Sequence, residues 1–293
     1  MIEKIVFYGK GGVGKSTLIA NISAALIDAG FRVLQVGCDA KADSSRTLNG
    51  GFSVPTVSQA YSAHGTLDYD RVVHRGFKGV FCIEAGVKIT TEAADGRRSV
   101  VQPLDLLIES GLIDKLPVDF VLFDVSGDES CAELHQTFYR AGITRAYIVT
   151  TADFASLTTV NSIVEALERF GDANIPVPFA GLIANGISSS FEDSFIADFA
   201  KQIGTRTIGK IPRSLMVRQC ELYGKTVVEA SPLSNQAFFY RRLANQIVDE
   251  TNPDLPKTQP HSLSREKMRI WALAWADRLF SLENGLVTDG AAI

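Results

Sequence analysis

Runs of apolar residues alternate with segments of helical periodicity along most of this chain. Most of the runs consist of Val, Ile, Leu and Phe without polar alternation, which is typical of strands covered on both faces. They lie at residues 2–8, 32–37, 79–84, 118–123, 145–150, 178–184 and 206–211. Helical spacing of apolar positions is clearest at residues 16–29, 100–110, 155–170, 191–203 and 234–249. This alternation predicts an α/β fold, a doubly wound and mostly parallel sheet of about seven to eight strands that binds ligands at the carboxyl ends of the strands.

The pattern changes near residue 250. Residues 251–260 are polar and rich in proline, as in a linker. The segment that follows has one apolar helical face, formed by Met268, Trp271, Trp275, Leu279 and Leu282. We therefore expect a domain at 1–250 and, at 251–293, a linker and an amphipathic helix (264–282) that packs on the domain or extends it. A surface-binding role for this helix stays open because of its basic residues Arg265, Lys267, Arg269 and Arg278.

Composition narrows the class of protein. The 293 residues are 46% hydrophobic and 21% charged, as in chains with a large core, and the net charge of −4 provides no general basic field for nucleic acid. No apolar run reaches the length of a membrane span, and the first predicted strand leaves no room for a signal peptide. The four cysteines, Cys38, Cys82, Cys131 and Cys220, show no Cys-x-x-Cys spacing, so the sequence suggests neither a disulfide framework nor a zinc site. We predict a cytoplasmic protein with reduced thiols.

A glycine-rich motif lies between the first predicted strand and the first predicted helix. It comprises Gly9, Lys10, Gly11, Gly12, Val13, Gly14, Lys15, Ser16 and Thr17. Such a motif binds phosphate in this context, because backbone N–H groups and the helix dipole point at one anion. Lys15 would reach the β- and γ-phosphates, and the Ser16 hydroxyl would bind Mg²⁺. A glycine-rich turn without a ligand is the alternative.

Acidic residues follow two other predicted strands. Asp39 and Asp43 come just after the second apolar run, where they could sense Mg²⁺ or an attacking water, or could be ordinary turn residues. Asp124 follows four apolar residues, as in a Walker B element whose carboxylate holds the Mg²⁺ shell, with a purely structural role as the alternative. Gly127 and Asp128 would then lie where a switch loop contacts the γ-phosphate.

Together these motifs resemble a known family. A second lysine inside the glycine loop, Lys10, is typical of the signal-recognition/MinD class of dimeric P-loop ATPases. Within that class, residues 8–17, 36–44 and 123–128 resemble the nitrogenase iron protein and its relatives in light-independent chlorophyll synthesis and other tetrapyrrole reductions. Weaker matches extend the resemblance over residues 1–250; they are Asn185, Pro212, Arg213, Gln236 and Tyr240.

The resemblance implies roles for individual residues. Lys10 would cross the interface of a homodimer to the ATP of the other subunit and stabilise charge on the transferred phosphoryl group. Asp128, with Asp39 as a second candidate, would orient or deprotonate the attacking water. Lys41 and Asp43 would belong to the first switch. The residues that would contact adenine are Asn185, Pro212 and Arg213.

The resemblance also implies a four-iron four-sulfur cluster that two cysteines of each subunit hold between them. Cys131 matches one of the two, but the other would lie twelve residues after Cys82, where this chain has Ala94. Gly96 and Arg97 still fit the family pattern, which supports this register. A cluster of this type takes four thiolates, and two copies of Cys131 supply two. We therefore expect no standard cluster, and leave non-cysteine ligands or a third partner open.

The leading hypothesis is a homodimeric ATPase with Mg-ATP as its cofactor. ATP hydrolysis would be coupled to action on an unidentified partner protein, in a regulatory or cofactor-maturation role, and a nitrogenase-like reductase component is one candidate for that partner. The first alternative is an ATP-dependent iron–sulfur electron donor with atypical cluster ligation. The second is a MinD/ParA-like partitioning ATPase, which would need a membrane-binding tail or a basic DNA face. We expect neither nucleic acid nor a membrane as a partner.

Overall fold

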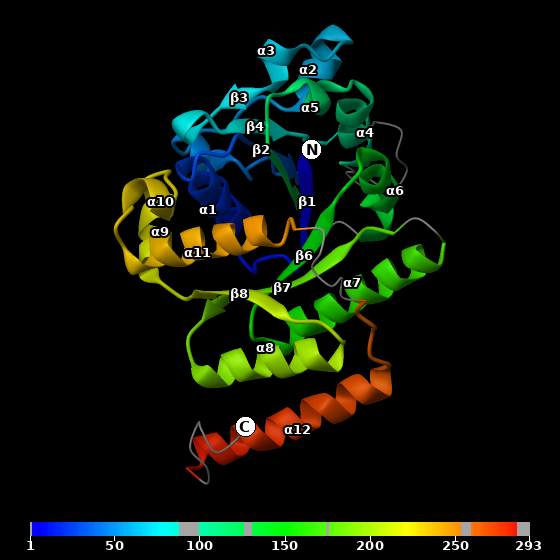
Figure 1. Ribbon diagram of the computed structural model, residues 1–293, viewed down its shortest axis with the longest axis vertical. Helices are drawn as coiled ribbons and strands as arrows, with labels where there is room; N and C mark the ends of the chain where they lie inside the picture. The colour runs from blue at the N-terminus through cyan, green and yellow to red at the C-terminus, as the bar shows by residue number, and fades with distance from the viewer. Residues whose placement is uncertain (1, 88–99, 126–130, 174–175, 253–258, 286–293) are drawn as a thin grey trace.

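The structure, a computed structural model, describes residues 2–87, 100–125, 131–173, 176–252 and 259–285. The described strands form one eight-stranded sheet in the order β3-β4-β2-β5-β1-β6-β7-β8 (Figure 1). Every neighbouring pair is parallel except β3 with β4. The strands are β1 (Glu3–Tyr8), β2 (Val33–Cys38), β3 (His74–Arg75), β4 (Phe81–Glu84), β5 (Phe120–Val125), β6 (Arg145–Thr150), β7 (Phe179–Ile187) and β8 (Thr207–Pro212).

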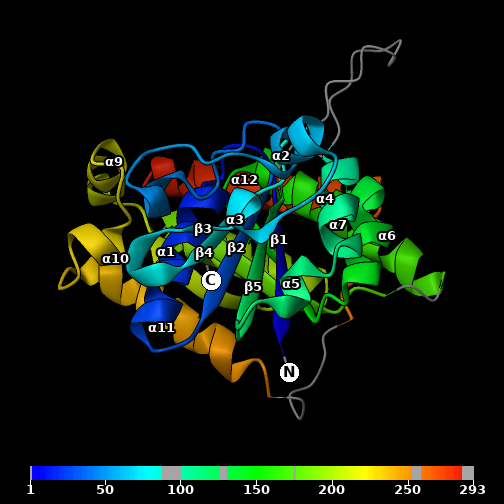
Figure 2. The same ribbon diagram turned by 90° about the horizontal axis from the view of Figure 1, so that it is seen from above.

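Helices cover both faces of this sheet, because parallel strands need crossover connections. The helices α1, α10 and α11 lie on one face, and α4, α6 and α7 lie on the other (Figure 2). The α-helices are α1 (Lys15–Asp28), α2 (Val57–His64), α3 (Tyr69–Val72), α4 (Val101–Glu109), α5 (Leu112–Lys115), α6 (Cys131–Ala141), α7 (Phe154–Asp172), α8 (Ser190–Gln202), α9 (Leu215–Leu222), α10 (Val227–Ala230), α11 (Asn235–Asp249) and α12 (Arg265–Glu283). Two short 3-10 helices are η1 (Arg46–Asn49) and η2 (Phe77–Gly79).

Side chains of the central strands pack into a core on each face of the sheet. In β1, Ile5 and Phe7 belong to the core that α1 and α11 cover, whereas Val6 and Tyr8 belong to the core on the opposite face. All four side chains are at most 2% exposed. The apolar runs show no polar alternation because both faces of these strands are buried. The predicted doubly wound sheet is confirmed.

The predicted elements differ from the observed ones mainly at their ends. Each of the seven predicted strands is present within three residues of its expected bounds, and each of the five predicted helices within two. The eighth strand, β3, was not predicted. Its two residues carry no hydrophobic pattern, and they form a strand only because they pair with the edge of β4.

The C-terminal helix α12 lies along α8 (Figure 1). Trp271 stacks on Phe195, and the indole N–H groups of Trp271 and Trp275 both donate to Asp198 Oδ2 at 2.8 Å. Leu279 was predicted on the same packed face, but it is 42% exposed. The two helices run antiparallel, and Trp275 contacts Phe191 in the first turn of α8. Leu279 lies one turn further along α12, beyond the N-terminal end of α8, so α8 does not cover it. Among the described helices, none is both long and apolar enough to cross a membrane.

Candidate nucleotide-binding site

The glycine loop joins β1 to α1 at the carboxyl edge of the sheet, as predicted. Two of its glycines stand where a side chain would collide with the backbone or with a neighbour. A Cβ at Gly9 (φ +146°) would lie 2.3 Å from the Val149 carbonyl oxygen, and one at Gly14 (φ +85°) would lie 2.6 Å from Asn185 Nδ2. The loop therefore packs tightly against β6 and β7, and this packing fixes the direction of its N–H groups.

Lys15 lies inside the curve of this loop. Its side chain is buried (6% exposed), and Nζ donates to the carbonyl oxygens of Gly9, at 2.9 Å, and Lys10, at 3.2 Å. The ammonium group is thus held where the loop and the N-terminus of α1 face the same space. An anion bound there would meet a fixed positive charge in addition to the helix dipole.

A cavity of about 990 Å³ opens in front of the loop, a size within the range of small-molecule sites. The predicted residues that line it are Gly11, Gly12, Gly14, Lys15, Ser16, Thr17, Asp39, Lys41 and Asp43. Lining residues that the sequence analysis did not identify are Ser44, Arg46, Thr47, Gly50, Gly51, Val125, Arg218, Glu221, Leu222, Tyr223 and Gly224. The wall opposite the loop thus comes from α9 and the turn after it, some 200 residues along the chain. The Thr17 hydroxyl donates to Glu221 and joins the two walls.

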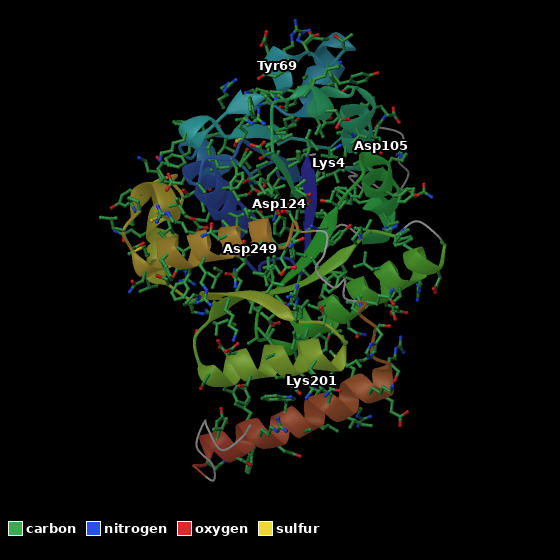
Figure 3. All side chains as sticks on the ribbon, in the orientation of Figure 1. Lys4, Tyr69, Asp105, Asp124, Lys201 and Asp249 are labelled. Carbon is green, nitrogen blue, oxygen red and sulfur yellow. The ribbon has the colours of Figure 1, made fainter. Side chains whose placement is uncertain are left out.

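Asp124, at the end of β5, lies near the middle of the molecule (Figure 3), next to the cavity-lining residues Ser16 and Ser44. It is 2% exposed and accepts hydrogen bonds from the hydroxyl groups of Ser16 and, at 2.6 Å, of Ser44. Burial raises the pKa of Asp124, while these two hydrogen bonds and the charge of Lys15 act against that rise. The two predicted Mg²⁺ ligands, Ser16 and Asp124, therefore meet at one point beside Lys15.

A second buried carboxylate, Glu84, lies in the same row of the sheet. Gly37 of β2 is in register with Glu84 of β4 on one side and with Asp124 of β5 on the other. A Cβ at Gly37 would lie 1.9 Å from Glu84 Oε2, so the row requires glycine at its centre. Glu84 is fully buried, and burial raises its pKa from 4.5 to about 7, although hydrogen bonds from Ser45 lower it. The sequence analysis did not identify Glu84, because this row of residues forms only when β4, β2 and β5, which are distant in the sequence, pair in the sheet.

This pKa predicts a pH dependence of stability. Below the unfolded-state pKa of 4.5, Glu84 is protonated in both states; between 4.5 and about 7 the unfolded state ionises first, so the native state loses relative stability as pH rises. Glu84→Gln removes this contribution. We expect the unfolding free energy of the variant, relative to wild type, to rise from pH 5 to pH 7 and to level off above about pH 7.5. Urea unfolding at several pH values measures the difference, and parallel curves would contradict the assignment.

The remaining predicted site residues lie around the loop. Lys10 Nζ is 3.7 Å from Asp153 Oδ1, and both side chains are about half exposed (42% and 52%). Asp39 Oδ1 accepts from the Lys41 N–H at 2.8 Å, which is the turn geometry considered as its alternative, while its side chain also lines the cavity. Lys41 and Asp43 are exposed at the cavity mouth.

The predicted adenine contacts lie at the ends of β7 and β8. Asn185 Nδ2 donates to the Val13 carbonyl oxygen at 2.7 Å, so this side chain holds the glycine loop. Pro212 ends β8, and Arg213 Nε donates to the Gly186 carbonyl oxygen at 3.4 Å. None of the three lines the described cavity, and their contact with adenine stays a prediction.

Several predicted positions lie outside the described residues. They are Ala94, Gly96, Arg97, Gly127 and Asp128. Cys131 begins α6. The cysteines Cys38, Cys82 and Cys220 are buried, and burial raises the pKa of the Cys82 thiol to about 12.

The fold is that of P-loop nucleotide-binding proteins of the MinD/ParA type. The solved structure of the cell-division protein MinD from Aquifex aeolicus superposes with a TM-score of 0.65, at 19% identity over 87% of this chain and 99% of that chain. MinD from Pyrococcus horikoshii, solved with Mg-ADP, superposes with the same TM-score at 22% identity, over 86% of this chain and 98% of that one. At such identities the likeness concerns the fold alone.

Sequence comparison gives the family within this class. The chain belongs to the 4Fe-4S iron sulfur cluster binding proteins, NifH/frxC family, whose family model matches residues 3–270. It is 36% identical over 291 residues to nitrogenase iron protein 2 of Paenibacillus durus, covering 99% of this chain and 98% of that protein. It is 35% identical over 257 residues to the nitrogenase iron protein of Methanococcus voltae, covering 87% and 91%. The resemblance stated from the motifs is therefore confirmed.

Proposed function

We propose that the protein is a homodimeric switch that hydrolyses Mg-ATP and passes the resulting conformational change to a partner protein. The observation that carries this proposal is the convergence of Lys15 and Ser16, which line the cavity, with the buried Asp124, which accepts a hydrogen bond from Ser16 and feels the charge of Lys15. Phosphates would lie against the loop N–H groups and Lys15, and Ser16 and Asp124 would hold Mg²⁺, which neutralises charge on the phosphates. Membership of the family supports a dimer that acts on a partner protein.

Calorimetry with Mg-ADP and Mg-ATP tests the binding step, and the molecular mass in solution with each nucleotide tests the dimer. We expect heat of binding with both nucleotides, and the mass of a dimer when ATP is bound. Absence of heat, or the mass of a monomer in every nucleotide state, would refute the proposal.

In this proposal Lys10 and an acidic residue act on the transferred phosphoryl group. Lys10 would reach across the dimer. Its ion pair with Asp153 would not prevent this, because the pair is exposed and exposed ion pairs contribute little to stability. Asp153 itself is fixed, since it caps α7 by accepting from the Ser156 N–H at 2.8 Å. Asp128, or Asp39 at the cavity wall, would orient the attacking water.

Lys10→Ala should separate binding from hydrolysis. Because Lys15 and not Lys10 lies inside the loop, we expect the Kd for Mg-ADP to change by less than about threefold while kcat falls by about 100-fold. Asp153→Asn, which releases Lys10 without removing it, serves as the control and should keep kcat within about threefold of wild type. Calorimetry and phosphate release measure the two quantities. Equal losses in binding and in turnover would argue against the assigned division of roles.

The donor set of this chain does not fit a standard four-iron four-sulfur cluster. Such a cluster takes four thiolates, and Cys131 supplies two in a dimer, since Ala94 stands where the family pattern has the second cysteine. The described cysteines are no substitutes: Cys82 faces the core beneath α1, and its raised pKa keeps it protonated. We infer that the partner receives a conformational signal, in a regulatory or cofactor-maturation role, and no cluster electron.

The second candidate is an ATP-dependent reductase with atypical cluster ligation. It is favoured by the family description and by the relatives, which are nitrogenase iron proteins. Iron analysis of anaerobically purified protein separates the two candidates. About four irons per dimer that support reduction of a partner would favour the reductase.

A further inference from the structure

Glu84 makes a clamp with the loop that lines one wall of the nucleotide cavity. The Glu84 Oε1 atom accepts two hydrogen bonds from Ser45, one from the backbone N–H at 2.7 Å and one from the hydroxyl at 2.6 Å. The preceding residue, Ser44, donates its hydroxyl to Asp124 and accepts from Gln35 Nε2 through its carbonyl and hydroxyl oxygens, both at 2.9 Å. Two consecutive serines thus attach the loop to the ends of β4 and β5.

The attached loop, residues 39–45, carries Lys41 and Asp43 at the mouth of the cavity. Its backbone is strained at Ala42, whose φ of +50° lies in the left-handed region that residues with a side chain disfavour. Such a conformation persists only where the surroundings hold it in place. Within the loop, Asp39 accepts from the N–H groups of Lys41 and Ala42. The contacts that attach the loop to the sheet are those of Ser44 and Ser45, both buried. Lys41 and Asp43 are exposed.

Glu84 also lies at the start of a second anchored segment. After β4, the Ala85 N–H donates to the Gly37 carbonyl oxygen at 2.9 Å. Ser58, in the first turn of α2, donates its N–H to the Ala85 oxygen at 3.1 Å and its hydroxyl to the Val87 oxygen at 2.9 Å. The carboxylate therefore connects the nucleotide-side loop to a segment that is itself fixed on α2. Among the described residues, none donates a hydrogen bond to Glu84 Oε2, so the side-chain hydrogen bonds of Glu84 within this part of the chain are those from Ser45.

We propose that Glu84 is a positioning residue: through Ser45 it holds residues 39–45 at the wall of the nucleotide cavity and so sets Lys41 and Asp43 for ATP turnover. This inference rests on the proposed ATPase function. Glu84 does not line the cavity, so its removal should slow turnover and loosen residues 39–45 while nucleotide affinity is largely kept.

The test compares Glu84→Ala, Ser45→Ala, the double variant and Glu84→Gln, which keeps an acceptor oxygen. One readout is independent of ATP: the rate at which trypsin cleaves after the exposed Lys41 without nucleotide. We expect Glu84→Ala to raise this rate by about tenfold and to lower kcat by about tenfold, with the Kd for Mg-ADP within about threefold of wild type. Ser45→Ala should change both quantities in the same direction, and it carries the test if Glu84→Ala does not fold.

Two comparisons make the outcome specific. The double variant should be no worse than Glu84→Ala, because Glu84→Ala already removes both hydrogen bonds from Ser45, of which Ser45→Ala removes only the one from the hydroxyl. Glu84→Gln should stay within about threefold of wild type. The matched control is Glu168→Ala. Glu168 also accepts from a serine N–H, that of Ser262 at 2.9 Å, but neither residue lines the cavity, and its loss should change neither quantity.

Unchanged cleavage after Lys41 in both Glu84→Ala and Ser45→Ala, or an equal effect of Glu168→Ala, would overturn the proposal. A wild-type protein that hydrolyses no ATP would instead refute the proposed function, and the cleavage rates would still decide whether Glu84 holds the loop.

Discussion

Replacing Lys15 with alanine should weaken the binding of Mg-ADP by about 100-fold or more, because the phosphates lose the ammonium group that the loop holds in its curve. The change should also loosen the loop itself. In the free protein Lys15 Nζ holds the carbonyl oxygens of Gly9 and Lys10, and alanine would leave both without this donor. Calorimetric titration with Mg-ADP measures the effect.

A lysine elsewhere on the same strand–helix unit provides the control. Lys4 Nζ also donates to a backbone carbonyl oxygen, that of Ala141 at 3.0 Å, and pairs with Asp114, but it does not line the cavity. Lys4→Ala should leave the Kd for Mg-ADP within about twofold of wild type. Equal losses of affinity in the two variants would mean that the titration reports general stability, and the phosphate-binding role of Lys15 would be wrong.

The iron content should respond sharply to a single restored cysteine. Anaerobically purified wild-type protein should hold fewer than about one iron per dimer, whereas Ala94→Cys should raise this to about four, with broad absorption near 400 nm. The physical reason is ligand number, because Ala94→Cys gives the dimer four thiolates when Cys131 is counted from both subunits. Ala94 lies outside the described residues, so the sequence register alone places it.

Two variants control this experiment. Ala93→Cys adds a thiol one position away and should not raise the iron content, because the register would be wrong. Cys131→Ser in the Ala94→Cys background should remove the iron that the first change gained. Wild-type protein that already holds about four irons per dimer would show that other ligands complete the cluster, and would support the reductase instead.

The fold could be predicted because each central strand carries its own signal, a continuous run of apolar residues. Strands such as β1 are buried on both faces, so their sequence is apolar throughout, and this pattern is legible without any partner strand. The limits of the pattern appear at the edges of the structure. The strand β3 and the exposed end of α12 at Leu279 depend on which neighbour is present, the edge of β4 in one case and the short helix α8 in the other.

The sequence by itself determined the glycine loop between its strand and helix, and it marked Asp124 at the end of another strand. The loop is a continuous stretch whose strand, glycines, lysine and helix lie in order along the chain, and Asp124 is marked by the apolar residues before it. Through the family resemblance, the sequence also predicts that Ala94 stands where the family pattern has a cysteine.

Only the tertiary structure decided what surrounds this loop. The wall formed by α9 meets Thr17 across about 200 residues of chain, and Glu84, Gly37 and Asp124 become neighbours only through the order of β4, β2 and β5. Local patterns do not encode which strands adjoin or in what register, because these depend on the packing of the whole sheet. The same holds for Lys10, whose ion pair with Asp153 exists because β1 and β6 end side by side.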